Sequence, residues 1–133
     1  MLRGLTTITF TADDLTAARE WYAEVLGIQP YFSRDVDGAP AYIEFRIGDY
    51  QHELGIVDRR FTGPAPERPG GATAYWAVDD VQAAFDRLLA LGAQVYQEPI
   101  ERGPGFVTAS VVDPFGNVLG VMFNQHYLDV LGA

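Results

Sequence analysis

The sequence predicts an α+β fold in which two βαβββ modules form a curved mixed sheet around a concave pocket, with the helices on the outer face. Two observations indicate this fold. Segments with an apolar residue at every second position, as in strands, alternate with segments whose apolar residues recur at helical spacing. The chain also contains an internal repeat, because residues 7–14 align with residues 73–80 without a gap and a helical pattern follows each segment.

The first module is expected at about residues 5–57 and begins with a strand and a helix. Ile8 and Phe10 alternate with threonines, which is typical of a strand. Asp13 and Asp14 follow as candidate N-caps, since either side chain can accept a hydrogen bond from the first turn of a helix. The other expected elements are the helix at 15–26, ended by Gly27, an extended segment before the Asp37-Gly38 turn, and strands at 41–47 and 50–57.

Residues 58–71 are rich in proline and glycine, which predicts a linker before the second module at about residues 72–123. Asp80 stands where Asp14 stands in the first module and is again a candidate N-cap. The elements expected here are a helix at 81–91, strands at 73–78, 94–97, 106–112 and 118–123, a hairpin at Asp113-Pro-Phe-Gly-Asn117, and a tail at 124–133 without a clear pattern. We expect residues 1–133 to form one domain.

The charge balance excludes several partners and chemistries. The chain has 18 acidic and 9 basic residues, all of the latter arginine, for a net charge of −9, which argues against nucleic acid and permits a cationic ligand. Without lysine or cysteine there is no Schiff base, disulfide or thiol nucleophile. No apolar run approaches the ~18 residues of a membrane helix, so we expect a cytoplasmic protein without a membrane partner.

The order of several short motifs resembles the vicinal oxygen chelate superfamily, which includes glyoxalase I, extradiol dioxygenases, fosfomycin-resistance enzymes and bleomycin-resistance proteins. The resemblance covers about residues 5–123. The motifs that carry it are Phe10-Thr-Ala-Asp-Asp-Leu15, Trp21-Tyr-Ala-Glu-Val-Leu-Gly27, Trp76-Ala-Val-Asp-Asp-Val81, Leu91-Gly-Ala93 and Val112-Asp-Pro-Phe-Gly-Asn-Val118.

The resemblance also implies four positions that hold a divalent ion in metal-dependent relatives. They fall on Thr7, Glu53, Thr73 and Gly120. Such an ion needs several carboxylate or imidazole ligands, and Glu53 alone supplies one. We therefore expect no metal and no other cofactor. His52 is adjacent to Glu53 and should point to the opposite face of its strand, and His126 lies in the tail.

Alternation along the strands divides the side chains between the two faces of the sheet. Residues expected to line the ligand pocket are Thr7, Thr9, Tyr42, Glu44, Arg46, Gln51, Glu53, Thr73, Tyr75, Phe106, Thr108, Ser110, Gly120 and Met122. Residues expected to pack under the helices are Ile8, Phe10, Ile43, Phe45, Ile47, Leu54, Ile56, Trp76, Val78, Leu119, Val121 and Phe123.

A two-residue loop at Gly48-Asp49 would place Arg46 opposite Gln51 and Glu44 opposite Glu53. Opposed carboxylates are destabilising unless something compensates them. Arg46 could compensate the two carboxylates through an internal ion pair, or a cationic group of a ligand could compensate them. The remaining alternative is that the two strands pair in a different register. If the pair is desolvated, one carboxyl should have a raised pKa and could act as a base.

Residues 101–107 contain two glycines and a proline, which predicts a constrained loop before a pocket strand. From this loop Phe106 could close over a ligand as an aromatic lid. An ordinary turn is the alternative.

Three functions are compatible with the resemblance. The first is a metal-independent binding protein of the bleomycin-resistance kind, a homodimer that sequesters a cationic or aromatic drug or metabolite and so confers antibiotic resistance. The second is a glyoxalase-, isomerase- or dioxygenase-like enzyme, a lyase or oxidoreductase, with Glu53 or Glu44 as the candidate base. The third is an interaction or regulatory protein with a vestigial pocket. We favour the first, so we lean against catalysis.

Overall fold

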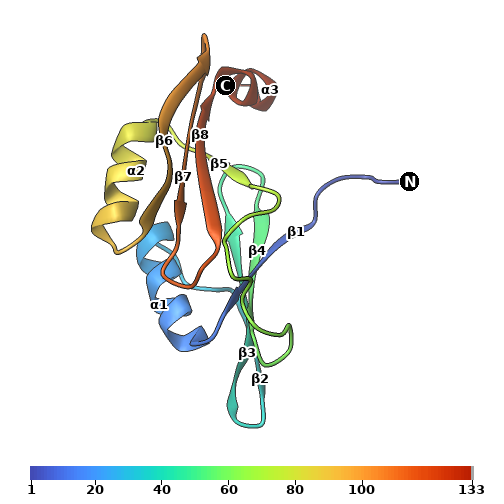
Figure 1. Cartoon of the computed structure of the whole chain (residues 1–133). Coiled ribbons are helices and arrows are strands. Elements are labelled where there is room, and N and C mark those ends of the chain that lie inside the picture. The colour runs from blue at the N-terminus through green and yellow to red at the C-terminus, as the bar shows by residue number, and fades with distance from the viewer. Residues whose placement is uncertain (133) are drawn as a thin grey trace. The chain divides into compact units, whose positions relative to one another are not determined.

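The computed structural model describes residues 1–132 and divides into two compact units, Met1–Glu67 and Arg68–Ala133, which are described separately below (Figure 1). The division falls within the predicted linker. Each unit contains a four-stranded mixed sheet, which confirms the predicted α+β class and the repeated βαβββ order.

The first unit contains one helix and one sheet. Its elements are β1 (Thr7–Ala12), α1 (Leu15–Leu26), β2 (Phe32–Val36), β3 (Ala39–Ile47) and β4 (His52–Asp58). The spatial order of the strands is β1-β4-β3-β2, with β1 parallel to β4 and the other neighbours antiparallel. Of the two candidate N-caps, Asp14 caps α1 and accepts a hydrogen bond from the backbone nitrogen of Ala17 at 3.0 Å. Gly27 ends the helix as predicted, in the left-handed conformation with a φ of 68°.

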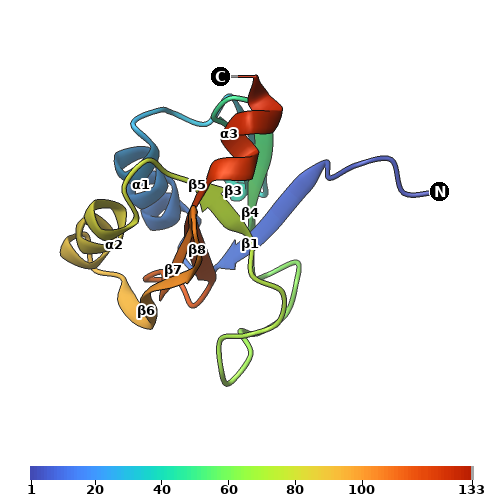
Figure 2. The ribbon, with the colours of Figure 1, turned by 90° about the horizontal axis from the view of Figure 1, so that it is seen from above.

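One face of the first sheet is covered by α1 and forms the core of the unit. Tyr22 of α1 is 1% exposed, and its ring lies 6.2 Å from that of Phe10 on β1. The strand residues buried in this layer include Ile43, Phe45, Leu54 and Ile56. The opposite face carries the threonines of β1 together with Glu44, Arg46 and Glu53 of β3 and β4, as their alternation predicts. In Figure 2 the segment before β1 extends away from this sheet.

The second unit repeats this arrangement and adds a helix. Its elements are β5 (Tyr75–Ala77), α2 (Val81–Ala90), β6 (Gln94–Gly103), β7 (Phe106–Val112), β8 (Val118–Asn124) and α3 (Gln125–Leu131). The spatial order of the strands is β5-β8-β7-β6, and α2 lies against one face, as Figure 1 shows. Asp80 caps α2 by accepting from the backbone nitrogen of Ala83 at 3.0 Å, as predicted.

Three boundaries in the second unit differ from the prediction. β5 is shorter and leaves Thr73 outside the strand. β6 continues to Gly103, because its antiparallel pairing with β7 persists through irregular register shifts as far as the turn. The predicted loop at residues 101–107 is therefore mostly strand, with the turn itself at Pro104-Gly105.

The tail contains a helix that the sequence pattern did not reveal. Asn124 caps α3, and its side chain accepts a hydrogen bond from the backbone nitrogen of Tyr127 at 3.2 Å. The backbone nitrogen of Gln125 donates to the carbonyl of Gly105 at 2.9 Å, so α3 begins beside the tip of the β6–β7 hairpin (Figure 1). Within residues 1–132, no helix has the length and apolar character needed to cross a membrane.

Candidate functional site

The pairing of β3 with β4 differs from the predicted register. Arg46 lies opposite Glu53, and Glu44 lies opposite Gly55, so the expected Arg46–Gln51 and Glu44–Glu53 pairs are wrong. The loop holds residues 48–51 instead of two residues, because Gln51 adopts a left-handed φ of 54° and its side-chain nitrogen donates to the carbonyl of Gly48 at 2.9 Å. Gln51 therefore lies in an exposed loop and not on a strand.

The shift amounts to two residues, so the other side chains keep their predicted faces while their partners change. Glu53 is the centre of the resulting contacts. The Thr7 hydroxyl on β1 donates to Glu53 Oε2 at 2.7 Å, and Arg46 Nη1 lies 3.2 Å from Glu53 Oε1. Both carboxylate oxygens are thus engaged by side chains of the same unit.

Arg46 has further contacts that hold its guanidinium in place. Its Nη1 atom donates to the carbonyl of Gln51 at 3.4 Å, and its guanidinium carbon lies 4.5 Å from the centroid of the Tyr31 ring. The outcome is the third predicted alternative, a different register, so Glu44 and Glu53 are not opposed. Arg46 forms an internal ion pair, but with Glu53 as its direct cross-strand neighbour.

Glu44 has different surroundings. The Tyr42 hydroxyl, two residues earlier on β3, donates to Glu44 Oε1 at 2.5 Å. The Tyr42 ring lies over Gly55, where an added Cβ atom would be 2.7 Å from the ring carbon Cε1. Gly55 is therefore part of the site, since any side chain there would displace the tyrosine. The sequence signal for it was a glycine inside a strand, which often marks such a close approach.

The electrostatics of this face raise two pKa values. Desolvation and, second, the nearby charge of Glu53 raise the pKa of Glu44, while Arg46 opposes them. Desolvation and then Glu53 also raise the pKa of Tyr42, which keeps that hydroxyl a hydrogen-bond donor. The predicted carboxyl with a raised pKa is thus found at Glu44, although its neighbour across the strand is Gly55 and not Glu53.

Aromatic side chains complete this part of the sheet. Phe32 on β2 lies opposite Glu44, and its ring centroid is 6.2 Å from that of Tyr42. Phe32 remains 47% exposed. The strands β2, β3 and β4 therefore bring together a carboxylate and two aromatic rings, one of them a phenol, on one face next to the Thr7–Glu53–Arg46 contacts.

The residues at the superfamily's metal positions do not fit a divalent ion. In the first unit, Thr7 and Arg46 occupy the oxygens of Glu53. In the second, a Cβ atom at Gly120 would lie 2.7 Å from Tyr75 Cδ1 and 2.8 Å from the carbonyl oxygen of Ala74, so a ligating side chain there would collide with backbone. Across residues 1–132, no group of three or more His, Asp or Glu side chains is placed to hold an ion.

Neither histidine joins the polar face. His52 pairs with Ile47 on β3, and its ring centroid lies 5.6 Å from that of Tyr50. Because it precedes Glu53 on the strand, it belongs to the opposite face, as predicted. His126 lies in the exposed first turn of α3.

The predicted pocket residues of the second unit share one face of its sheet, apart from Thr73, which lies outside β5. The register aligns Tyr75 and Ser110 with Gly120, and Thr108 with Met122. Thr108 is 5% exposed and accepts a hydrogen bond from Arg102 Nε at 3.2 Å, a partner that the sequence did not indicate. Phe106 is half-buried directly after the turn, so the role of a lid stays a prediction.

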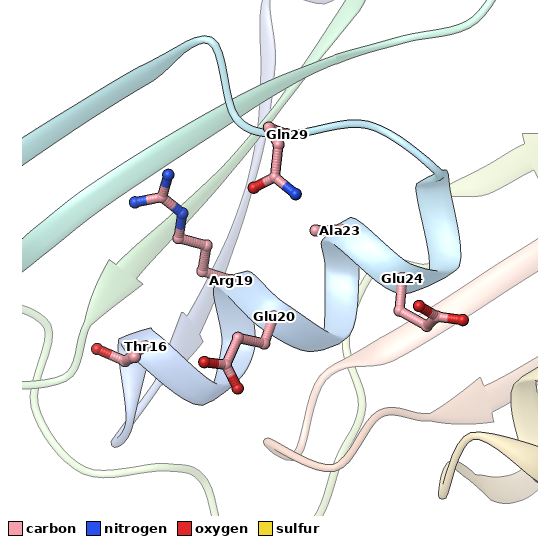
Figure 3. A pocket seen from close by; sticks show the side chains of 6 residues that line it. All are labelled: Thr16, Arg19, Glu20, Ala23, Glu24 and Gln29. Carbon is pink, nitrogen blue, oxygen red and sulfur yellow. The ribbon is translucent and has the colours of Figure 1, made fainter.

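Two surface pockets lie away from all of these residues. One, of about 470 Å³, lies along the exposed side of α1 (Figure 3). Figure 3 shows Arg19 extending toward the loop that carries Gln29, with the Glu20 and Glu24 carboxylates below the helix axis in this view. The other, of about 420 Å³, lies at the start of α2. Neither includes a predicted pocket residue.

The comparisons with known proteins agree with this fold. The chain is similar to a glyoxalase-related enzyme from Fulvimarina pelagi, with 24% identity, a TM-score of 0.70, and coverage of 93% of this chain and 90% of that one. It is also similar to a lactoylglutathione lyase from Agrobacterium tumefaciens, with 22% identity, a TM-score of 0.66, and coverage of 91% and 93%. A third similar structure is a glyoxalase/bleomycin resistance protein from Streptomyces sp. CB03234, with 24% identity, a TM-score of 0.65, and coverage of 89% of this chain and 98% of that one.

At these identities the structural matches show the fold alone. No curated protein matches the sequence. A family model, the Glyoxalase/Bleomycin resistance protein/Dioxygenase superfamily, matches residues 4–121, which confirms the resemblance to the vicinal oxygen chelate proteins. Because that match spans nearly the whole chain, the chain belongs to the Glyoxalase/Bleomycin resistance protein/Dioxygenase superfamily.

Proposed function

We propose that this chain is a metal-independent binding protein that sequesters a small organic molecule, a drug or a metabolite. The observation that carries the proposal is the state of Glu53. Its two oxygens accept from Thr7 at 2.7 Å and pair with Arg46 at 3.2 Å. A divalent ion would have to displace both partners and would then find one carboxylate, whereas tight sites need several ligands.

Binding without a metal requires side chains that recognise the molecule directly. The exposed ring of Phe32 and the phenol of Tyr42 provide aromatic surface, and Glu44 provides a carboxylate next to them. Sites of this kind combine apolar and aromatic surface with a few placed polar groups. The family name includes both enzymes and a resistance protein, so family membership is compatible with binding alone.

The first test measures metal. The protein is purified without a metal-affinity column or chelator, its metal content is determined by mass spectrometry, and its Tm is recorded with added Ni²⁺, Zn²⁺ or Mn²⁺. We expect less than stoichiometric metal and no rise in Tm. Stoichiometric metal whose removal lowers Tm would contradict the proposal.

The second test measures ligand binding. A panel of aromatic and charged small molecules is screened by thermal shift, with and without a chelator. A ligand at 100 times its Kd should stabilise the protein by about 2.7 kcal/mol. We expect hits whose shifts are the same with chelator present. Hits that disappear with chelator would indicate a bound metal, and a panel without hits would favour an interaction role.

A second candidate function is acid–base catalysis, which the Tyr42–Glu44 pair favours. The Glu44 carboxyl has a raised pKa because of desolvation and Glu53, and it already bonds a phenol. Such a carboxyl can accept a proton from a bound molecule. The hemithioacetal of methylglyoxal and glutathione, assayed with chelator present, tests this. Catalysis would replace binding as the proposed function if the protein turns this compound over, if Glu44→Gln abolishes the turnover, and if the exposed control Glu98→Gln retains it.

A further inference from the structure

We infer that the ligand is an aromatic ammonium ion, with its cationic group at the Glu44 carboxylate and its ring against Phe32 and Tyr42. This inference rests on the proposed binding function and names the class of molecule bound. The site lies within the first unit, on the face of β2, β3 and β4 opposite α1, and involves no residue of the second unit.

The geometry of the sheet assembles the three groups. Phe32 and Glu44 are direct neighbours across β2 and β3, and Tyr42 lies two residues before Glu44, on the same face. The rings of Phe32 and Tyr42 lie 6.2 Å apart and are inclined at 58°. A carboxylate flanked by two rings suits an ammonium group carried on a short arm from an aromatic ring, because cations also interact favourably with ring faces.

The distribution of charge on this face distinguishes the two glutamates. Glu53 is paired with Arg46 and bonded by Thr7, so its charge is compensated within the chain. Glu44 has one oxygen bonded to the neutral Tyr42 hydroxyl, and among residues 1–132 no arginine lies within ion-pair distance of it. On this face the carboxylate without an ion-pair partner is therefore Glu44, where a ligand cation would supply one.

The effect of neighbouring charges on Glu44 supports this assignment. Desolvation and Glu53 together raise its pKa, and the lowering by Arg46 is the smallest of the three contributions. The ionised form of Glu44 is thus held at an energetic cost, and that cost falls when a ligand cation approaches. Functional groups commonly carry such a cost to the stability of the fold.

Arg34 is the group that could favour an anion instead. It lies on β2 opposite Tyr42, on the same face, and is exposed to solvent. Arg46 is already bound to Glu53 and stacked on Tyr31. Because Arg34 could still attract a carboxylate, the experiment compares a cation with an anion of the same shape.

Three probes of similar size carry different charges: phenethylammonium, 2-phenylethanol and 3-phenylpropionate. Their affinities are measured by titration calorimetry at pH 7 and low salt. We expect the cation to bind about tenfold more tightly than the alcohol, as a charge-assisted contact gives. The anion should bind more weakly than both. Added salt should reduce both the preference for the cation and the penalty on the anion, and should leave the affinity of the alcohol unchanged.

Variants assign the preference to Glu44. Glu44→Gln should reduce the affinity for the cation to that for the alcohol. Glu98→Gln makes an equal change of charge on the exposed strand β6 and should leave the affinity for the cation unchanged. Phe32→Ala should weaken the binding of the cation and of the alcohol to the same extent. The Tm of each variant shows that it folds.

The outcomes separate the two proposals. The inference of an aromatic ammonium ligand would be overturned by any of three results: equal affinities for the three probes, tightest binding of 3-phenylpropionate, or no binding of any probe. Panel binding that a chelator does not affect would still support the proposed function in those cases. Probe binding that requires added Zn²⁺ would overturn both.

Discussion

The Thr7 hydroxyl lies 2.7 Å from Glu53 Oε2 across the parallel pairing of β1 with β4, and so links the two strands that hold the first pair of the superfamily's metal positions. A hydrogen bond from a hydroxyl to a carboxylate therefore stands where metal-dependent relatives place two ligands. This contact, together with the Arg46 ion pair, makes the site an internal polar network.

Replacing Thr7 by valine tests this contact, because valine keeps the shape and removes the hydroxyl. We expect Thr7→Val to lower the free energy of unfolding by about 1–2 kcal/mol, because the lost bond has a charged acceptor but is only part-buried. Urea denaturation measures the change. Thr9→Val, on the same strand and face, is the control and should have a smaller effect. Equal losses in both variants would show that the bond to Glu53 contributes nothing specific.

Arg46 influences both glutamates on its face. Since it lowers the pKa of Glu44, Arg46→Gln should raise that pKa further above the ordinary range of a glutamate. The loss in unfolding free energy should stay below about 1 kcal/mol, because the ion pair with Glu53 is partly exposed. NMR titration of the Glu44 carboxyl carbon measures the pKa. Arg34→Gln serves as the control, and an unchanged or lower pKa in Arg46→Gln would contradict the proposed electrostatics.

The pKa of Glu44 also predicts how stability depends on pH. A carboxyl whose pKa is raised on folding binds its proton more tightly in the folded state, so ionising it costs folding free energy. That cost is absent below the unfolded pKa, grows as the pH rises from the unfolded toward the folded pKa, and is complete above the folded pKa. Glu44→Gln should therefore increase the stability at pH 7 by less than about 1 kcal/mol.

The same argument requires the gain from Glu44→Gln to disappear in acid, near pH ~3.5, where the wild-type carboxyl is protonated as well. Urea denaturation at both pH values measures it, with Glu98→Gln as the control for net charge. A variant that is less stable than wild type at pH 7 would show that the Glu44 charge is already compensated inside the chain.

Gly55 predicts a steric effect on the site. In Gly55→Ala the new Cβ would collide with the Tyr42 ring, so the ring must move and its bond to Glu44 is lost. We expect a loss of roughly 1–3 kcal/mol, as for other overpacked positions. The double variant Gly55→Ala/Tyr42→Ala should lose less than the two single variants combined, because the second change removes the collision. Strictly additive losses would place the tyrosine elsewhere.

The surroundings of Gly120 predict that a metal-binding side chain cannot be restored at the family's last ligand position by a single substitution. Gly120→Glu places a Cβ within 2.8 Å of the Ala74 carbonyl oxygen, which is backbone and cannot rotate away. The variant should unfold at a lower temperature than wild type, and added Zn²⁺ should not restore its Tm. Gly103→Glu is the matched control, because a Cβ atom at Gly103 meets no atom within 4 Å, so this variant should cost less stability. Restoration of Tm by Zn²⁺ in Gly120→Glu would contradict the proposed absence of a metal site.

Local patterns in the sequence determined the secondary structure and the facing of most side chains. Asp14 and Asp80 cap their helices, and Gly27 ends the first, because these signals act within one turn of chain. The alternation that separates Thr7 from Phe10 needs only the period of a strand. The helix α3 and the full length of β6 were not predicted, since their stabilising contacts come from the β6–β7 hairpin and the partner strand.

The tertiary structure decided which side chains meet. Gln51 adopts the left-handed conformation and so lengthens the β3–β4 loop. Residues other than glycine adopt this conformation rarely, and no turn pattern in the sequence predicted it here. The resulting two-residue shift preserves every face but gives Glu53 an arginine and Glu44 a glycine as cross-strand neighbours. Residue types and faces follow from local periodicity, whereas pairing depends on loop geometry and on contacts between distant strands, and these set the charge of the site.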